Sequence, residues 1–320
     1  MKMTDIIPSI SGSSSIALII HISPDGDAVG SSIALMLALE SMGKFVDIYC
    51  QDEVPKLFDF LEGSQRILKP DKKIKNYDMA ISLDCSDRDR MGTCASIMDT
   101  ASGSGNIDHH ISNTMYADIN IVDDKASATG ELIVELIHLL INSMDKEMAR
   151  ALYTAIASDT GGFSFSNSTP KSHRAVAHLI ESGVDVDEVS TILFKNHSLE
   201  WVRLLGEAIN SLKIYHKGKV AVMHITREML NTSGACEEHS SGIIQYAKDI
   251  IGVELGMVLR EIDDCTTKVG FRSQSSVDVS KLALEFGGGG HKRASGCTIN
   301  LPIDNAEQKL MKVVELYFKE

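Results

Sequence analysis

The side chains best suited to chemistry are a histidine and two aspartates near the start of the chain. Ile16 to Ile20 is an apolar run that predicts a buried β-strand, and HISPDGDAVGSS (residues 21–32) follows it directly, with His21, Asp25 and Asp27. Carboxylates suit hard divalent ions, and imidazole adds a preference for first-row transition metals. The segment predicts part of a metal site, although aspartates that cap the helix expected over 28–42 would give the same pattern.

Three later segments also place acidic or histidine side chains where a regular element should end. An apolar strand over 78–83 precedes Asp84, residues 106–107 lead into Asp108-His109-His110, and a helix over 147–158 runs into Asp159. Open parallel sheets bind ligands outside the carboxyl ends of their strands. We therefore expect one cluster of ligands, which exceeds the needs of one zinc ion and suits two ions. The expected ligands are His21, Asp25, Asp27, Asp84, His109 and Asp159.

The order of these motifs resembles that of the DHH phosphoesterase superfamily. Its four N-terminal motifs are matched by HISPDGDAVGS, LDCSD, DHH and SDTGGF, and the C-terminal motif of its DHHA1 branch is matched by GGGGHKRASG, residues 287–296. By length and architecture the chain is most similar to the nanoRNase and pAp-phosphatase subgroup. Those proteins hydrolyse very short oligoribonucleotides and 3'-phosphoadenosine 5'-phosphate (pAp).

The resemblance implies two Mn²⁺ ions, or Mg²⁺ or another divalent metal in their place, with Asp84 bridging them. His21 and Asp25 would complete one ligand shell. The other shell would be completed by Asp27, His109 and Asp159. A water or hydroxide held between the ions would attack phosphorus, since the ions lower its pKa and stabilise the charged transition state.

The resemblance also assigns catalytic roles next to the ions. His110 would contact the substrate phosphate, and Asp108 would orient a histidine through its free ring nitrogen. A purely structural role of Asp108 in its loop is the alternative. Arg90, in DRDRMG, aligns with an arginine of the family but has no separate support in the sequence.

The glycine-rich motif and two arginines are the expected substrate contacts. Glycines let main-chain N–H groups face a phosphate, and His291 can add a charged donor; a flexible linker is the alternative. Arg272 matches a family arginine that contacts substrate, whereas Arg260 could equally form an ion pair with a neighbouring acid. The expected substrate-binding residues are Arg272, His291, Gly288, Gly289, Gly290 and Arg260.

Composition narrows the classes of protein. The net charge of the 320 residues is −13, which argues against long nucleic acid held along a basic face. Apolar runs are too short for a membrane span, no secretion signal is visible, and the six cysteines form no CxxC pair. We expect a cytoplasmic enzyme that acts on short RNA or a small nucleotide, without long duplex or membrane partners. Because the family often dimerises, the resemblance also implies a homodimer. Six further histidines (His173, His178, His197, His216, His224 and His239) have no ligand-like partners in the sequence.

Periodicity predicts an α/β fold of two domains. Residues 1–186 alternate strands (16–22, 45–50, 78–83, 106–110) with helices (28–42, 128–141, 147–158, 171–182), as in a parallel DHH-type sheet with helices on both faces. Residues 187–213 are expected to form a helical connector. Residues 214–320 are expected to form a smaller α/β DHHA1 domain with strands over 219–225, 252–261 and 268–273 and a helix over 277–286. A site split between two domains would imply closure over a short substrate.

Three rival functions remain open on the sequence. One is a linear or cyclic dinucleotide phosphodiesterase, acting on pApA or pGpG. Another is a polyphosphatase or pyrophosphatase, which the glycine-rich motif of the nucleotide-cleaving branch disfavours. The third is a catalytically silent nucleotide-binding module, which the complete ligand set disfavours.

Overall fold

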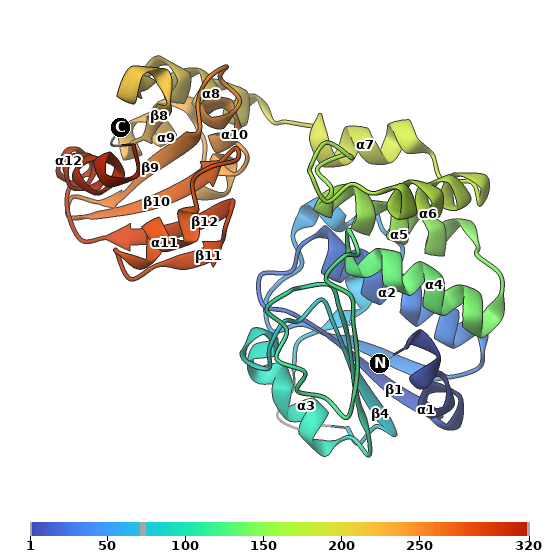
Figure 1. Cartoon of the computed structure of the whole chain (residues 1–320). Helices are drawn as coiled ribbons and strands as arrows, with labels where there is room; N and C mark the ends of the chain where they lie inside the picture. Colours follow the sequence, from blue (N-terminus) through green and yellow to red (C-terminus); the bar gives the residue numbers. More distant parts are fainter. Residues whose placement is uncertain (1, 71–74, 319–320) are drawn as a thin grey trace. The chain divides into compact units, whose positions relative to one another are not determined.

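The chain folds into two compact units, Met1–Asn196 and His197–Glu320. The structure is a computed structural model that describes residues 2–70 and 75–318, with the side chain of His291 left out (Figure 1). The segment 187–213, expected as a connector, is divided between the units, because the helix α7 (Val186–Phe194) belongs to the first and α8 (Leu199–Asn210) to the second. Within the described residues, no helix is both long enough and apolar enough to cross a membrane.

The first unit is built on a six-stranded parallel sheet with the order β3-β2-β1-β4-β5-β6. Its strands are β1 (Ser15–Ile20), β2 (Phe45–Tyr49), β3 (Ile67–Leu68), β4 (Met79–Leu83), β5 (Ser104–Asp108) and β6 (Ile119–Val122). The chain order reverses between β1 and β4. In open α/β sheets this reversal opens the crevice in which ligands bind.

Helices cover both faces of this sheet, which confirms the predicted fold class. In β1, Ile16, Leu18 and Ile20 face one core, while Ala17 and Ile19 face the other. The first core also contains residues of α2, α4 and α5, and the second contains residues of α3 (Figure 1). Burial on both faces explains why these strands are continuously apolar instead of alternating.

The remaining elements of the first unit are helical. The α-helices are α1 (Ile7–Gly12), α2 (Gly26–Ser41), α3 (Ala95–Thr100), α4 (Thr129–Ile141), α5 (Lys146–Asp159), α6 (Pro170–Glu181) and α7. Short 3₁₀ turns are η1 (Met3–Asp5), η2 (Lys56–Phe58), η3 (Ser64–Arg66) and η4 (Asp89–Cys94). The helices expected over 28–42, 128–141, 147–158 and 171–182 correspond to α2, α4, α5 and α6.

The second unit has its own six-stranded sheet, with the order β11-β12-β10-β9-β8-β7. Its strands are β7 (Lys213–Tyr215), β8 (Val220–Ile225), β9 (Leu255–Asp263), β10 (Thr266–Ser273), β11 (Gly289–His291) and β12 (Ala294–Ile299). Its helices are α8, α9 (Arg227–Ser233), α10 (Ile244–Lys248), α11 (Val279–Leu284) and α12 (Ile303–Val314), with 3₁₀ turns η5 (His216–Gly218), η6 (Glu237–Ser240) and η7 (Glu315–Tyr317).

Two separate cores cover the two faces of the second sheet. One core joins Leu255, Met257 and Phe271 to residues of α11 and α12. The other joins Val258 to residues of α8 and α10, including Trp201. Because side chains alternate along a strand, Arg260, Lys268 and Arg272 lie on the same face as Val258.

The helix α2, which follows His21, is held on the sheet by close packing against α5. A Cβ added at Gly30 would lie 2.3 Å from the Ala151 carbonyl oxygen, so the backbones of the two helices approach too closely for a side chain. Gly30→Ala should therefore destabilise the protein by roughly 1–3 kcal/mol, the usual cost of overpacking, despite its better helix propensity. Gly12→Ala is the matched control, because nothing lies within 4 Å of the added methyl group. Equal urea midpoints for the two variants would contradict this packing.

Candidate active site

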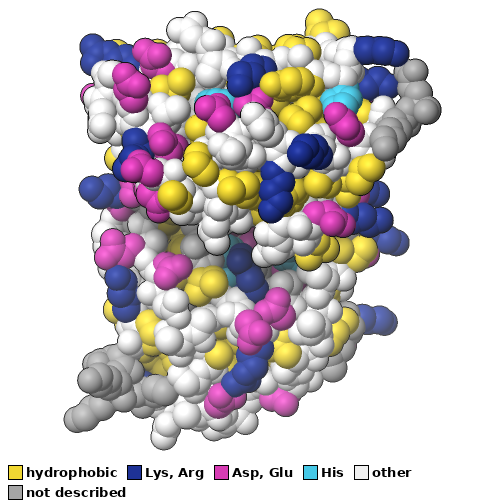
Figure 2. Space-filling model, turned by 90° about the vertical axis from the view of Figure 1, so that its left-hand side faces the viewer, with side chains coloured by type: hydrophobic (Ala, Val, Ile, Leu, Met, Phe, Trp, Pro, Cys, Tyr) yellow, Lys and Arg dark blue, Asp and Glu magenta, His cyan; other side chains and the backbone are white. Residues whose placement is uncertain are grey.

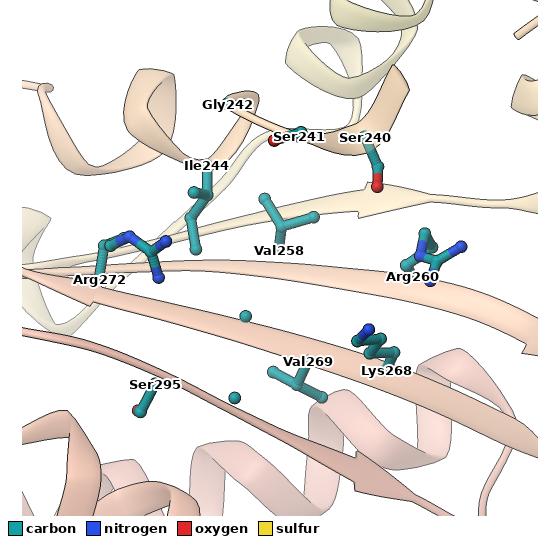
Figure 3. Close-up of a pocket in the computed structure, with 12 residues that line it drawn as sticks. Ser240, Ser241, Gly242, Ile244, Val258, Arg260, Lys268, Val269, Arg272 and Ser295 are labelled. Carbon is teal, nitrogen blue, oxygen red and sulfur yellow. The ribbon is translucent and has the colours of Figure 1, made fainter. Parts of the chain in front are cut away.

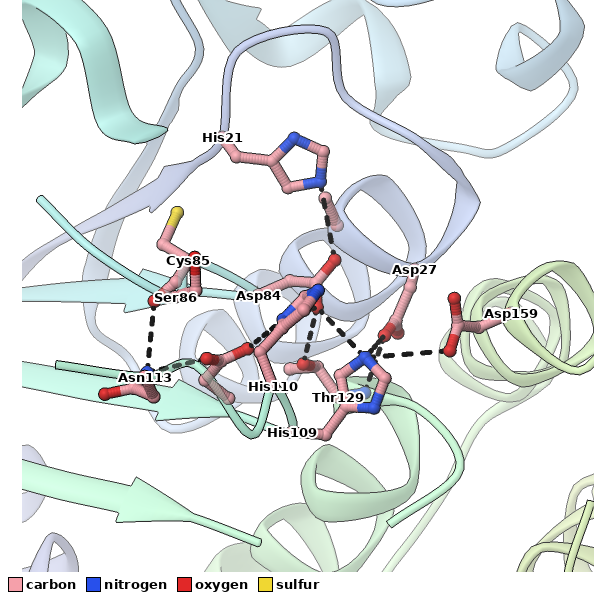
Figure 4. A network of polar contacts seen from close by, with 12 residues as sticks. His21, Asp27, Asp84, Cys85, Ser86, His109, His110, Asn113, Thr129 and Asp159 are labelled. Atoms are coloured by element: carbon pink, nitrogen blue, oxygen red, sulfur yellow. Dashed lines mark hydrogen bonds and ion pairs between the residues drawn. The ribbon is translucent and has the colours of Figure 1, made fainter. Parts of the chain in front are cut away.

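Asp84 lies at the centre of a cluster of ligand-type side chains in the first unit (Figure 4). It follows β4 directly and has a φ of +59°, a left-handed conformation that is uncommon for a residue other than glycine. Its Oδ2 lies 3.4 Å from His21 Nε2, and its Oδ1 lies 3.6 Å from His109 Nε2. The two oxygens of one carboxylate, only 2% exposed, thus face two different histidines.

The first group of side chains consists of His21, Asp25 and Asp84. His21 follows β1, its Nδ1 lies 2.8 Å from the Ile22 carbonyl oxygen, and its Nε2 is 3.7 Å from Asp25 Oδ1. The same Asp25 oxygen accepts hydrogen bonds from the N–H groups of Asp27 and Ala28, each at 3.1 Å. Asp25 therefore caps α2 and faces His21 at the same time, so the two interpretations of this residue are compatible.

The second group consists of Asp27, His109 and Asp159. His109 Nε2 lies 3.8 Å from Asp27 Oδ2 and 3.6 Å from Asp159 Oδ2. Asp27 also accepts hydrogen bonds from the N–H groups of Thr129 and Gly130, at 2.6 and 2.8 Å. These two residues begin α4, and the positive end of a helix stabilises a buried carboxylate.

His110 stands beside both groups and is held by a carboxylate. Its Nδ1 lies 2.7 Å from Asp108 Oδ1 and 3.6 Å from Asp84 Oδ1. Asn113 Nδ2 donates to the other Asp108 oxygen at 2.6 Å. Burial disfavours the charged ring, but the hydrogen bond to Asp108 and the charge of Asp84 prevail and raise the pKa of His110 to about 9. His110 can therefore donate a proton or a hydrogen bond near neutral pH.

The charges of this cluster are poorly compensated by the protein alone. Burial, together with the charges of Asp84 and Asp159, raises the pKa of Asp27 well above its ordinary value. Burial likewise raises the pKa of Asp159 to about 6, although His109 opposes the shift. Burial disfavours a charged His21, but the facing carboxylates of Asp25 and Asp84 prevail and raise its pKa to about 10.

The donor set fits divalent cations. Separations of 3.4–3.8 Å between facing oxygens and nitrogens exceed hydrogen-bond lengths, and ligand atoms at about 2.1 Å from a shared ion keep such spacings. Cations would also offset the repulsion between the buried carboxylates. Asp84 belongs to both the His21 group and a group with His109 and His110, so the structure brings together all six side chains expected as ligands.

Several residues that support the cluster were not anticipated from the sequence. Thr129 Oγ1 donates to Asp84 Oδ1 at 3.0 Å, in addition to the N–H bond to Asp27. Asn167 Nδ2 donates to the Asp159 carbonyl oxygen at 3.1 Å. A Thr-Gly pair at the start of a predicted helix could have indicated the contact of Thr129 with Asp84. No local sequence pattern indicates the contact of Asn167 with Asp159. Arg90, noted only as an alignment, places Nη2 3.0 Å from His21 Nδ1.

A groove of about 370 Å³ that carries three cationic side chains lies on the sheet of the second unit (Figure 3). Its floor is formed by β9, β10 and β12, and its opposite wall by η6 and the start of α10. Gly270 and Gly296 leave the floor open between the cationic side chains. The groove is lined by Ser240, Ser241, Gly242, Ile244, Val258, Arg260, Lys268, Val269, Gly270, Arg272, Ser295 and Gly296.

Three cations along this groove differ in their partners. Arg260 Nη1 lies 2.6 Å from Glu237 Oε2, so this arginine forms the ion pair that was its alternative role. Arg272 instead donates from Nη1 to the neighbouring carbonyl oxygen of Phe271, and burial lowers its pKa. Lys268, which sequence reasoning missed, lies directly opposite Arg260 in the sheet register. Like charges in this position repel each other, which favours binding of an anion.

The glycine-rich motif is part of the sheet and not a flexible linker. Gly289–His291 forms the edge strand β11, which pairs with β12. A Cβ at Gly288 would lie 2.2 Å from the Gly296 carbonyl oxygen, and one at Gly290 would lie 2.6 Å from that of Ala294. Two of the glycines are thus required by packing on β12, whereas Gly289 is open. The side chain of His291 lies outside the described part of the chain.

His224, for which no ligand-like partner was expected, has an acidic partner. Its Nε2 lies 2.8 Å from Glu307 Oε2, and Asp304 is close by. Lys213 Nζ and Tyr215 Oη also contact Glu307, at 2.8 and 2.6 Å. The group therefore forms a polar network that fastens α12 to β7 and β8. Sequence reasoning missed it because Glu307 is 83 positions away from His224 (307 − 224).

A histidine and carboxylate cluster at the switch point of a parallel sheet, followed by a second α/β unit with an anion-type groove, defines a class of metal-dependent phosphoesterases. The family models agree: residues 15–156 match the DHH family, N-terminal domain, and residues 217–320 match the DHHA1 domain. The chain belongs to the DHH family. It is a hydrolase of phosphate esters that depends on a divalent metal.

Individual relatives extend over most of the chain. It is 30% identical over 296 residues to the bifunctional oligoribonuclease and PAP phosphatase NrnA of Thermus thermophilus, with 92% of this chain and 87% of the relative covered. The protein of the same name from Bacillus subtilis is 28% identical, with 92% and 93% covered. The crystal structure of an exopolyphosphatase-related protein from Bacteroides fragilis superposes with a TM-score of 0.91 and 27% identity, covering 99% of this chain and 97% of that one.

Removing the shared carboxylate should remove metal without unfolding the first unit. Asp84→Ala should lower the content of bound Mn²⁺ from two ions per chain to one or none, because both groups lose a ligand. Metal analysis after gel filtration measures this, with circular dichroism to check the fold. Asp78→Ala is a control, since Asp78 precedes the same strand but lies at its opposite end. Two ions retained by the Asp84 variant would contradict a shared carboxylate.

Metal binding should release protons. In the metal-free site the pKa of His21 is about 10 and that of Asp159 about 6, so protons and cations compete for the same atoms. Mn²⁺ affinity should therefore rise from pH 6 to pH 9. Calorimetric titration in buffers with different ionisation enthalpies counts the released protons. A pH-independent affinity with no proton release would contradict the assignment of His21 as a ligand.

Proposed function

We propose that the protein hydrolyses short oligoribonucleotides to mononucleotides and pAp to AMP, with Mn²⁺ as the metal. The observation that carries this proposal is the pairing, in one chain, of the Asp84-centred cluster with a groove whose described lining includes three cations, Arg260, Lys268 and Arg272. Two relatives that extend over about nine-tenths of the chain are named as oligoribonuclease and PAP phosphatase, which supports the same conclusion.

Two bound divalent ions would supply a low-pKa water as nucleophile and would offset the negative charge that develops on the phosphate. The first unit's own side chains would hold those ions through the six expected ligands. His110, fixed by Asp108 at 2.7 Å, would donate a hydrogen bond to a phosphate oxygen. Thr129 would keep Asp84 in its place through the hydrogen bond at 3.0 Å.

The groove of the second unit would bind phosphates of the substrate. Arg272 has a planar guanidinium suited to two hydrogen bonds with one phosphate. Lys268 and Arg260 would bind a second phosphate, and the ion pair between Arg260 and Glu237 would break on binding. Glu237 is well suited to leave, because its side chain is 65% exposed. We infer that the backbone N–H groups of the open Gly289 and the side chain of His291 add further contacts.

Short substrates are favoured by the distribution of charge. The net charge of the chain is −13. On the face that Figure 2 shows, Lys and Arg side chains alternate with Asp and Glu among the described residues and form no continuous basic band. Since long single strands are held by many phosphate contacts, we infer that binding is concentrated on the terminal one to three nucleotides. Neither a membrane nor a long duplex is an expected partner, and the cytoplasm is the expected compartment.

The test is an assay of initial rates with Mn²⁺ on pAp, pApA, cyclic dinucleotides, pyrophosphate, polyphosphate and RNA of 2 to 24 nucleotides at two salt concentrations. We expect pAp and RNAs of about two to five nucleotides to be hydrolysed fastest. The slope of log affinity against log salt should be shallow, with a magnitude of about 2 or less, since at most three phosphates are engaged at about 0.7 each.

The outcomes separate the rival functions. Cleavage of dinucleotides alone would identify a dinucleotide phosphodiesterase, and cleavage of polyphosphate or pyrophosphate alone would identify a polyphosphatase or pyrophosphatase. No turnover at all would indicate a nucleotide-binding module. Equal rates at every length with a steep salt slope would contradict the proposal.

Arg272→Ala should reduce turnover of pAp without loss of bound Mn²⁺, because Arg272 acts on the phosphate.

A further inference from the structure

Two phenylalanine side chains are exposed beside the turn that follows Asp159. Phe165 is 45% exposed and Phe194 is 37% exposed. A Cβ added at Gly161 would lie 2.4 Å from the Cζ atom of Phe165, and one at Gly162 would lie 3.4 Å from the ring of Phe194. Both rings therefore border the glycine turn that starts at a carboxylate of the metal cluster.

The turn fixes Phe165 relative to that carboxylate. Gly161 and Gly162 have φ values of +56° and +64°, which produce a tight reversal directly after α5. The N–H of Phe165 donates to the Thr160 carbonyl oxygen at 3.0 Å. Asn167 Nδ2, two residues further on, donates to the Asp159 carbonyl oxygen at 3.1 Å. The backbone that carries Phe165 is therefore fixed on both sides of it in the sequence, which lowers the conformational cost of binding at this turn.

We propose that Phe165, with Phe194 at the same glycine turn, is a stacking platform for the nucleobase of the nucleotide whose phosphate is cleaved. The inference rests on the proposed function, since a nucleotide substrate brings a flat π-face close to the phosphate that is cleaved. The surrounding cluster is charged and suits the phosphate, whereas these two rings are apolar and suit the base. Aromatic stacking tolerates every base, so the platform provides affinity for the base without sequence preference.

The experiment compares pAp with the same sugar bisphosphate carrying hydrogen in place of adenine. Phe165→Ala should lower kcat/KM for pAp roughly 10-fold, mainly through KM, as expected for the loss of one stacking contact. Its kcat/KM for the base-free compound should equal that of the wild type. Phe165→Trp should restore the rate on pAp, and Phe194→Ala should lower it in the same direction by a smaller factor.

The matched control is Phe45→Ala. Phe45 is 53% exposed, but it begins β2 and so lies at the amino end of the sheet, away from the ligands. This variant should leave both substrates unaffected. Bound Mn²⁺ and the molar mass by light scattering are measured for every variant, so that damage to the metal cluster or loss of a contact with a second copy is detected.

Each result has a distinct meaning. If the wild type hydrolyses no nucleotide, the proposed function fails and the platform fails with it. If the wild type cleaves pAp and Phe165→Ala cleaves it equally well, the platform alone is wrong. An equal loss on pAp and on the base-free compound, a loss of Mn²⁺, or a change in molar mass would show that Phe165 only supports the Asp159 turn or covers an interface.

Discussion

The first unit depends on keeping several carboxylates together away from water. Asp27 and Asp84 are 1% and 2% exposed, and their mutual repulsion would disfavour the folded state if the protein did not compensate for it. Compensation comes from the start of α4, which donates two N–H groups to Asp27, and from the Thr129 hydroxyl on Asp84. The negative charge that these hydrogen bonds leave uncompensated favours the binding of divalent cations. The same carboxylates therefore affect both the stability of the fold and its function.

The sheet topology explains how residues distant in the sequence reach this cluster. Because all strands of the first sheet are parallel, their carboxyl ends lie on one edge, and the reversal between β1 and β4 opens that edge. His21 and Asp84 follow the two strands at the reversal, and His109 follows β5. Burial on both faces of the sheet keeps these strand ends fixed. The apolar packing of α2 and α5 on the sheet thus determines where the ligands lie.

The groove of the second unit carries few cationic side chains among its described residues. It places Lys268 opposite Arg260 and leaves Arg272 bonded only to a backbone oxygen among the described partners, while a single exposed Glu237 balances the set. Under the proposed function, such an arrangement would bind one or two phosphates of a short substrate. The acidic surface elsewhere has the same consequence, since it weakens attraction for nucleic acid beyond the groove. Under the proposed function, electrostatics would thus contribute to discrimination by substrate length.

The sequence alone determined the elements and the ligand types, because apolar periodicity and strand-end acids are local patterns. β1, β4, α2, α4 and α5 were predicted within two residues of their bounds, and all six expected ligands come from such strand or helix ends. It did not reveal the edge strands β3 and β6, which are two and four residues long, or that the glycine run pairs with β12. Only the tertiary structure decided the contacts between distant residues: Thr129 with Asp84, Lys268 opposite Arg260, and Phe165 over Gly161. Those contacts depend on helix packing, strand register and turn geometry, which are set by the whole fold and leave no mark on any single segment.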